Sequence, residues 1–261
     1  MDPELLAFAE DPSAFVRIGP DEDRVITDRA VVVFTPGAHF WSTTVARVRF
    51  QDGDVASELD EVRSLIGARE RDSAAWAIGP SATPADVTSA LTALGLERES
   101  DSGSSILVLT QEPAGRPSSF DVRSVSTYED HLSAIEIKNE GFGMAAEDAE
   151  DELRRARDSF EAERGGDHTA RLLVLDGDRP IASGQAWFAA EGVYLGGGAT
   201  IPSHRRRGAM SHLVAAAWSE ALRRGTPALV TSGGEMSTPP LLRLGFEMVG
   251  RIDRLIDRFR S

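Results

Sequence analysis

The chain of 261 residues contains no cysteine, which excludes disulfides, thiol nucleophiles and cysteine-ligated metals. It also contains no apolar run of about 18 residues, so we expect no membrane-spanning helix and no membrane partner. Its N-terminal segment is acidic and lacks the basic start and apolar core of a secretory signal peptide. We therefore expect a cytoplasmic protein.

Histidine and tyrosine are scarce. The chain has five histidines and two tyrosines. His204 and His212 are eight residues apart and have no third partner at metal-ligand spacing, so we expect no metal site. Only Tyr128 and Tyr194 offer a phenol for acid–base chemistry.

Basic residues are in the minority, with 28 Lys and Arg against 42 Asp and Glu. We expect no nucleic-acid partner, because binding to a phosphate backbone needs a broad basic face. Residues 201–261 are different, since they hold ten Arg against five acidic residues. This local excess favours an anionic ligand there, although a chance gathering of surface arginines is the alternative. The acidic remainder favours a cationic partner.

A segment rich in Pro, Gly and Ser at residues 111–119 divides the chain into two expected domains, residues 1–113 and 120–261. Both domains alternate strand-type and helix-type patterns, which predicts an α/β protein with a mixed sheet. The strands are expected at residues 29–35, 40–50, 74–78, 105–110, 120–125, 171–175, 181–188, 193–200, 227–231 and 247–259, and the helices at 54–69, 84–94, 127–140, 147–164, 209–224 and 237–244.

An internal repeat is suggested by residues 76–97 and 228–247. Each segment runs through a strand, a Gly/Ser turn, a Thr-Pro helix start and a Leu-Gly-apolar-Glu exit. Duplication and convergence on one strand–turn–helix design both explain the similarity. In the first half, the joint between strand and helix contains Asp52 and Asp54, which would repel an anion. We therefore expect an anion site in the second half only.

The most informative segment is TIPSHRRRGA at residues 200–209, between an expected strand and an expected helix. Unpaired N–H groups and the positive dipole end at a helix start favour an anion. Gly208 permits close approach of the backbone to a ligand, and Arg205, Arg206 and Arg207 add fixed positive charge. The pattern predicts a pyrophosphate site without a Walker lysine.

Residues 120–259 resemble a GCN5-related N-acetyltransferase (GNAT). The resemblance lies in the order of elements, in Arg205-x-x-Gly208 after Pro202, and in the Leu-Gly-Phe sequence at residues 244–246. The first half resembles the degenerate copy of tandem members. The resemblance implies the GNAT-like acyl-CoA N-acyltransferase fold in two tandem copies. It also implies transfer of acetyl from acetyl-CoA to a primary amine of a small molecule or peptide, by direct attack in a ternary complex.

The resemblance further implies that the cofactor lies along the expected strand at residues 193–200 and over the following turn. The three glycines at 196–198 either permit close approach of the pantetheine arm or only mark a bulge that curves the sheet. Ser237 either bonds the pantetheine or caps the last helix. The candidate cofactor-binding residues are Ala199, Thr200, Ile201, Arg205, Arg206, Arg207, Gly208, Ala209, Met210 and Ser237.

Catalysis needs a base for the amine, whose pKa is near 10.4 in a lysine-like group, and benefits from an acid for the leaving thiolate. Glu235 in the loop before the last helix is the candidate base, with Glu191 as a second choice and solvated carboxylates as the alternative. Tyr194 is the candidate acid, with core packing as the alternative. Ser232 completes the catalytic candidates as a possible partner of the pantetheine.

Two positions depart from the family pattern. Met210 stands where the family usually has Gly or Ala, and Leu241 stands where many members have a tyrosine acid. The missing tyrosine keeps a second function open, that of a non-catalytic acyl-CoA-binding or sensor protein. A monomer is compatible with these observations, and the oligomeric state stays open.

Overall fold

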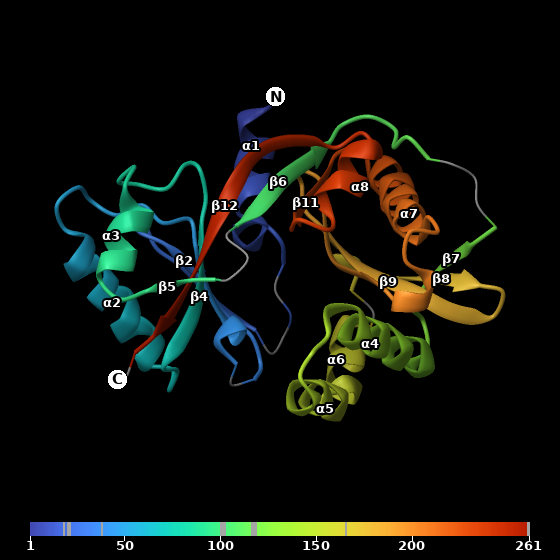
Figure 1. Cartoon of the computed structure of the whole chain (residues 1–261), viewed down its shortest axis with the longest axis horizontal. Helices are drawn as coiled ribbons and strands as arrows, with labels where there is room; N and C mark the ends of the chain where they lie inside the picture. Colours follow the sequence, from blue (N-terminus) through green and yellow to red (C-terminus); the bar gives the residue numbers. More distant parts are fainter. Residues whose placement is uncertain are drawn as a thin grey trace. The chain divides into compact units, whose positions relative to one another are not determined.

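The computed structural model describes residues 1–17, 19, 22–37, 39–99, 103–115, 119–164 and 166–259. The chain forms two compact units (Figure 1). The first comprises Met1–Ile106, Ser232–Thr238 and Met248–Ser261, and the second comprises Leu107–Thr231 and Pro239–Glu247. The units divide the chain differently from the contiguous halves 1–113 and 120–261, because its last strand belongs to the first unit. The expected linker at 111–119 lies partly outside the described residues.

The first unit contains a short antiparallel meander followed by a parallel strand. Strands β1, β2 and β3 pair antiparallel in order, and β3 pairs with β4 in parallel at only two positions. The last strand of the chain then pairs antiparallel with β4, from Asp253 opposite Ile78 to Arg258 opposite Ser73. The elements are α1 (Pro3–Glu10), η1 (Pro12–Ala14), β1 (Asp23–Ile26), β2 (Val31–Phe34), η2 (Phe40–Ser42), β3 (Thr43–Ala46), α2 (Val55–Gly67), β4 (Ser73–Ile78), α3 (Val87–Ala93), β5 (Glu97–Arg98) and β12 (Glu247–Arg258).

The second unit repeats this pairing scheme. Strands β8, β9 and β10 pair antiparallel in order, and β10 pairs with β11 in parallel at two positions. In the strand order, β6 lies next to β11, and β7 lies at the far end beside β8. The elements are β6 (Ser104–Leu109), β7 (Asp121–Ser124), α4 (Tyr128–Phe142), α5 (Ala146–Arg154), α6 (Ala156–Glu163), β8 (Thr169–Asp176), β9 (Arg179–Phe188), β10 (Val193–Thr200), η3 (Pro202–His204), α7 (Ala209–Arg224), β11 (Leu229–Gly233) and α8 (Thr238–Arg243), of which β6, β11 and α8 begin or end in the first unit.

Two helices cover opposite faces of β8, β9 and β10 in the second unit (Figure 1). Successive strand residues point to opposite faces. Ser183 on β9 donates a hydrogen bond to the carbonyl oxygen of Ala134 on α4, over 3.1 Å. The next residue, Gly184, faces α7, because a Cβ there would lie 3.3 Å from Leu213. The sheet of this unit is therefore enclosed by α7 on one side and by α4 on the other.

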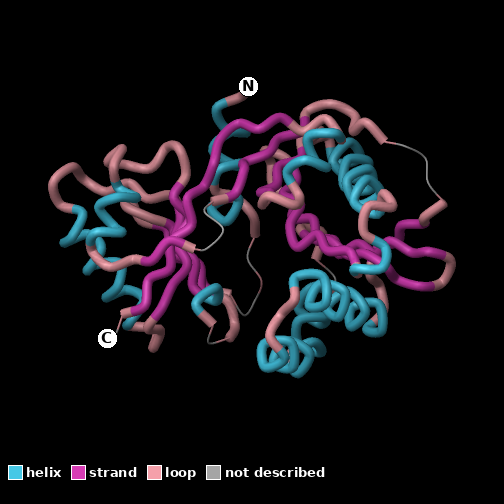
Figure 2. The backbone as a smooth tube through the Cα atoms, in the orientation of Figure 1, coloured by secondary structure: helices cyan, strands magenta, loops and turns pink. Residues whose placement is uncertain are grey.

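The two units share one order of elements, namely three antiparallel strands, a helix, a parallel strand and a second helix. Figure 2 shows that each unit combines helices with strands. This order confirms the expected mixed α/β sheet and its two tandem copies. It also accounts for the similarity between residues 76–97 and 228–247, because the first segment runs from β4 through α3 and the second from β11 through α8. None of the helices in the described part of the chain is long and apolar enough to cross a membrane.

The elements around residue 200 match the sequence-based expectation closely. β10 and α7 have the predicted bounds, Gly225 ends α7 in a left-handed conformation with φ 78°, and Thr127 caps α4 by accepting a hydrogen bond from the Asp130 N–H. The single helix expected at residues 147–164 is wrong, because α5 ends and α6 begins on either side of Arg155. Helix α1 and strand β1 had no counterpart in the sequence-based expectation.

Candidate cofactor site

Strand β10 loses its partner on one side soon after it begins. Val193 pairs with Leu229 and Tyr194 pairs with Val230, and no later residue of β10 pairs with β11 within the described strands. On its other side, β10 stays paired with β9 up to Thr200, with a register shift between Gly196 and Ala199. The free edge therefore offers backbone donors and acceptors to a ligand, and the three glycines at 196–198 lie at the register shift.

The turn after β10 leads into an uncapped helix. A short 3₁₀ turn, Pro202–His204, is followed by Arg206 with φ 63° and by Gly208 with φ 97°. Gly208 is the N-cap of α7 and has no side chain to accept the first N–H groups of the helix. Those N–H groups have no acceptor within the helix, and they carry the positive end of its dipole. This geometry is that of an anion site.

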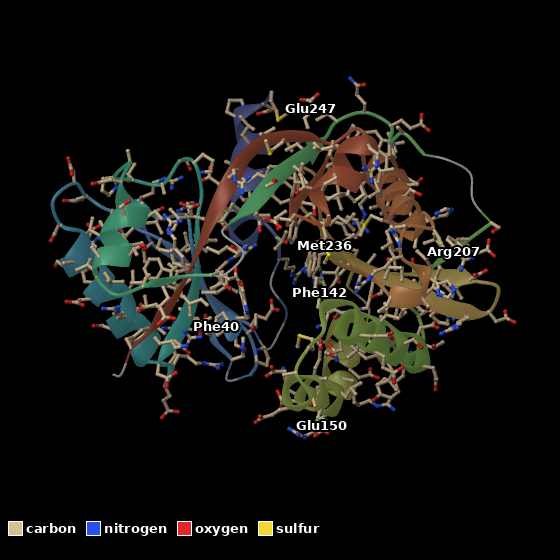
Figure 3. All side chains as sticks on the ribbon, in the orientation of Figure 1. Phe40, Phe142, Glu150, Arg207, Met236 and Glu247 are labelled. Carbon is tan, nitrogen blue, oxygen red and sulfur yellow. The ribbon has the colours of Figure 1, made fainter. Side chains whose placement is uncertain are left out.

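The three arginines of the turn have different partners. Arg205 donates to the carbonyl oxygens of Gly141 at 2.9 Å and Thr200 at 3.3 Å, so its side chain ties the end of α4 to the end of β10. Arg207 points to the hairpin between β8 and β9 (Figure 3), where its Nη2 lies 3.2 Å from an Asp176 carboxylate oxygen.

Arg206 is exposed and makes no side-chain hydrogen bond or ion pair within the described residues. Of the three guanidinium groups that the sequence offered for a phosphate, Arg206 is thus the one not already engaged with the protein. Arg205 and Arg207 hold the turn in place. The backbone N–H of Arg205 donates to the carbonyl oxygen of Pro202 at 3.4 Å, so the backbone N–H of Arg207 is the one that stays a candidate for the ligand.

Met210 points into the protein and not toward the ligand side of the turn. Its side chain is half-buried between two hydrophobic clusters, and a Cβ on Gly198 would lie 3.1 Å from its ε-methyl group. The larger residue is accommodated because β10 has a glycine opposite it. Ala199, Ile201 and Ala209 are buried in the same region, so their side chains pack in the core. The backbone N–H of Ile201 already donates to the carbonyl oxygen of Ile181 at 3.0 Å.

Tyr194 stacks on Trp187, its neighbour on β9, with ring centroids 5.3 Å apart and an interplanar angle of 28°. Both side chains are half-buried. The pair lies over Gly196, where a Cβ would come within 3.1 Å of the tyrosine ring. The Tyr194 hydroxyl has no hydrogen-bond partner within the described residues. The phenol therefore lies beside the free part of β10, on the face covered by α4.

Ser232, Glu235 and Ser237 belong to the first unit. Glu235 is exposed, and neither it nor Ser232 has a side-chain partner in the part of the chain that the structure describes. Ser237 directly precedes α8, and its hydroxyl donates to the carbonyl oxygen of Gly234 at 3.3 Å. Of the two roles suggested for Ser237, the capping bond does not occur among the described residues.

Leu241 is only 4% exposed and packs in the same cluster as Trp218 of α7 and Phe246. The position at which many family members have a tyrosine acid is therefore a hydrophobic core position in this chain. No acid–base role remains for it.

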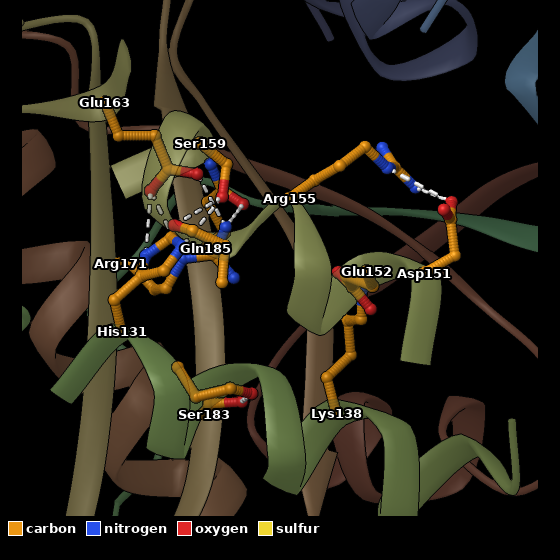
Figure 4. A network of polar contacts seen from close by, with 12 residues as sticks. His131, Lys138, Asp151, Glu152, Arg155, Ser159, Glu163, Arg171, Ser183 and Gln185 are labelled. Carbon is orange, nitrogen blue, oxygen red and sulfur yellow. Dashed lines mark hydrogen bonds and ion pairs between the residues drawn. The ribbon is translucent and has the colours of Figure 1, made fainter. Parts of the chain in front are cut away.

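A polar network fixes α4 and α6 to the sheet (Figure 4). His131 on α4 is fully buried, with Nε2 2.9 Å from the Ser159 hydroxyl on α6. Glu163 accepts two hydrogen bonds from Arg171 on β8, which also donates to Gln185 on β9. Burial lowers the pKa of His131, and the charge of Arg171 acts in the same direction. The network secures α4, whose C-terminal end holds Arg205.

A buried carboxylate lies at the corresponding strand-to-helix connection of the first unit, just before α2. Glu58 on α2 is 1% exposed and accepts a hydrogen bond from the Gln51 N–H at 2.9 Å. Its other oxygen lies 3.3 Å from Nε of Arg29. The first turn of α2 thus carries a buried acidic residue, whereas the first turn of α7 has none; neither helix has a side-chain cap. The sequence showed the acidic joint through Asp52 and Asp54, but not the buried Glu58.

Sequence reasoning also missed Asp176, which meets two residues of the turn from the β8–β9 hairpin. The only signal for it was an acidic residue at a tight turn, and such residues are common in turns for their own sake. No cluster of three or more metal-ligating side chains occurs among the described residues.

The family of this part of the chain follows from a comparison with known proteins. Residues 132–246 match the model of the acetyltransferase (GNAT) family, so this part of the chain is a GNAT-family domain.

Solved structures resemble the chain over nearly its whole length. A GCN5-related N-acetyltransferase from Kribbella flavida has 17% identity and a TM-score of 0.71, covering 98% of this chain and 96% of that one. A functionally unknown conserved protein from Staphylococcus epidermidis has 10% identity and a TM-score of 0.70, covering 96% and 98%. A tandem GNAT protein from the clavulanic acid biosynthesis pathway has 14% identity and a TM-score of 0.62, covering 99% and 94%. These similarities show the fold.

No curated protein is similar enough in sequence to give a significant match.

Proposed function

We propose that this protein transfers the acetyl group of acetyl-CoA to a primary amine of a small molecule or peptide, by direct attack in a ternary complex. One observation carries the proposal. The turn before α7 combines an uncapped helix start, Gly208 at the N-cap, and the exposed guanidinium of Arg206, which has no partner among the described residues. Each of these favours a pyrophosphate.

The residues of the second unit fit a coenzyme A at two further points. The edge of β10 after Tyr194 has no partner strand, so its backbone groups can bond the peptide-like pantetheine arm. The turn from Ile201 to Gly208 leaves backbone N–H groups beside the free edge. Ser232 in β11 and Ser237, which directly precedes α8, are further proposed partners of the pantetheine, although both belong to the first unit.

When bound, acetyl-CoA would supply a thioester whose carbonyl carbon an amine can attack. We assign the polarisation of the thioester carbonyl to a backbone N–H between Gly196 and Ala199, where the register of β10 shifts. We assign Glu235 as proton acceptor for the amine and Tyr194 as proton donor for the leaving sulfur, because both side chains lack a competing partner. Holding the two reactants together is the largest expected term, on the order of 7–11 kcal/mol at best.

We further propose that residues 120–261 carry the transferase and that residues 1–113 are its degenerate copy, acting as scaffold and not as a second active site. The support is the buried carboxylate of Glu58 in the first turn of α2, because the first turn of α7 has no acidic residue. A phosphate at the first position would meet that carboxylate. We also propose that the protein is cytoplasmic, as the sequence led us to expect.

The test is a thiol-release assay with acetyl-CoA and a panel of primary amines, in which cationic amines are matched in size to neutral ones. We expect amine-dependent release of CoA thiol, faster with the cationic amines because the chain carries a net charge of −14. CoA binding without turnover on any amine would instead favour the non-catalytic acyl-CoA-binding protein. No CoA binding at millimolar concentration would contradict both functions.

A further inference from the structure

One carboxylate in the β8–β9 hairpin contacts the cofactor turn twice. Oδ2 of Asp176, the last residue of β8, lies 3.4 Å from Nε2 of His204 and 3.2 Å from Nη2 of Arg207. His204 is 9% exposed, and its other ring nitrogen is 2.9 Å from the Ser203 hydroxyl. The two contacts join the hairpin to the turn on both sides of Arg206.

The backbone of the turn needs such support. Arg206 adopts φ 63°, a left-handed conformation that a residue with a Cβ rarely takes unless its surroundings enforce it. Asp176 holds the residues at positions 204 and 207, and Arg205 is held separately by the carbonyl oxygens of Gly141 and Thr200. Because the side chains of residues 204, 205 and 207 contact other elements, Arg206 is the residue left exposed beside the start of α7.

Asp176 is distinguished from its neighbour in the same hairpin. Asp178 is exposed and has no ion pair or hydrogen bond within the described residues. The Arg207 guanidinium, besides pairing with Asp176, lies 5.4 Å from the centre of the Phe120 ring. Two carboxylates of equal charge thus lie two residues apart, and only one of them contacts the turn.

We propose that Asp176 is a positioning residue for the acyl-CoA site. This acidic side chain strengthens the binding of an anion, because it holds the turn in the shape that presents Arg206 and the N–H groups before α7. The proposal rests on the proposed function, since it takes the turn to be the cofactor site. Charge alone predicts the opposite sign, because removing a carboxylate near bound phosphates should favour them.

Calorimetry with coenzyme A tests the proposal on the unsubstituted protein, on Asp176→Asn and on the matched control Asp178→Asn, at one ionic strength. We expect Asp176→Asn to weaken binding about tenfold or more. Asp178→Asn should leave the dissociation constant within about twofold of the original or tighten binding. Binding by Asp176→Asn that equals or exceeds that of the unsubstituted protein would overturn the inference while leaving the proposed function intact. No binding by the unsubstituted protein would overturn both.

Two further readouts separate positioning from a general structural role. Asp176→Asn should raise the KM for acetyl-CoA and leave kcat nearly unchanged, since the residue does not touch the reacting atoms. Asp176→Glu, which keeps the charge, should recover part of the affinity. In the Asp176→Asn background, Arg207→Gln should weaken binding far less than it does alone, because its partner is already lost. Equal losses in both backgrounds, or a fall in kcat alone, would contradict the assignment.

Discussion

Two glycines at the two ends of α7 allow the cofactor turn to be tested against an internal control. Gly208 precedes the helix with φ 97°, and Gly225 follows it with φ 78°. A Cβ at Gly208 would have the Ser211 hydroxyl at 3.7 Å as its nearest neighbour, and a Cβ at Gly225 would have no atom within 4 Å. Replacement by alanine therefore creates no clash at either end.

The cost of each substitution in the free protein is conformational. A left-handed conformation costs an L-residue about 1–2 kcal/mol, so Gly208→Ala and Gly225→Ala should each lower the free energy of unfolding by about this amount. Their effects on coenzyme A should differ. The methyl group at position 208 projects where phosphate oxygens must approach the N–H groups, and we expect at least tenfold weaker binding, or about 1.4 kcal/mol. Gly225→Ala should leave binding unchanged.

The assay combines urea unfolding, which gives the stability of both variants, with calorimetry against coenzyme A. Gly208→Glu strengthens the comparison, because a carboxylate at a helix start is favourable for the helix and unfavourable for a phosphate. We expect this variant to fold and to lose measurable cofactor binding. Equal coenzyme A affinity for Gly208→Ala and Gly225→Ala, in folded protein, would refute the placement of the phosphate at the start of α7.

Three further predictions address other positions. Leu241→Tyr should lower the free energy of unfolding by about 1–3 kcal/mol through overpacking of the core and should not raise kcat in the thiol-release assay; a clear gain in kcat would contradict the core position. Tyr194→Phe keeps the stack on Trp187 and should lower kcat about 10²-fold at unchanged coenzyme A affinity, whereas an unchanged kcat would leave Tyr194 a packing residue. The pKa of His131 is lowered by burial in the folded state, so the unfolded chain takes up that proton first on acidification and stability falls below about pH 6.5; His131→Gln should flatten the decline in unfolding free energy between pH 7 and 5, and an unaltered slope would show that other groups cause it.

The sequence predicted the two elements on either side of residues 201–208 well, because their signals are local. The bounds of β10 and α7 follow from the glycines and arginines around them and from the apolar face of α7, and the structure has the same bounds. The position of Met210 needed the structure. Whether the Met210 side chain faces a ligand or the core depends on the residue of β10 against which it packs. That residue is Gly198, which leaves room for the side chain.

Features that depend on distant pairing were not predictable in this way. The last strand of the chain pairs with β4, some 175 residues earlier. The residue pattern of the last strand predicts a strand but does not indicate which strand it pairs with. The different side-chain partners of Arg205 and Arg207 likewise could not be predicted, because Gly141 and Asp176 lie on other elements. Local patterns predict which segments form strands and helices, whereas the choice of partners is settled by tertiary packing.

The central claim is that the segment from β10 to the start of α7 holds coenzyme A, and amide hydrogen exchange tests it most directly. The account predicts that added coenzyme A slows exchange in peptides covering residues 195–212 and leaves the start of α2, near Glu58, unchanged. Protection at the start of α2 instead, or binding that leaves residues 195–212 unprotected, would contradict the account.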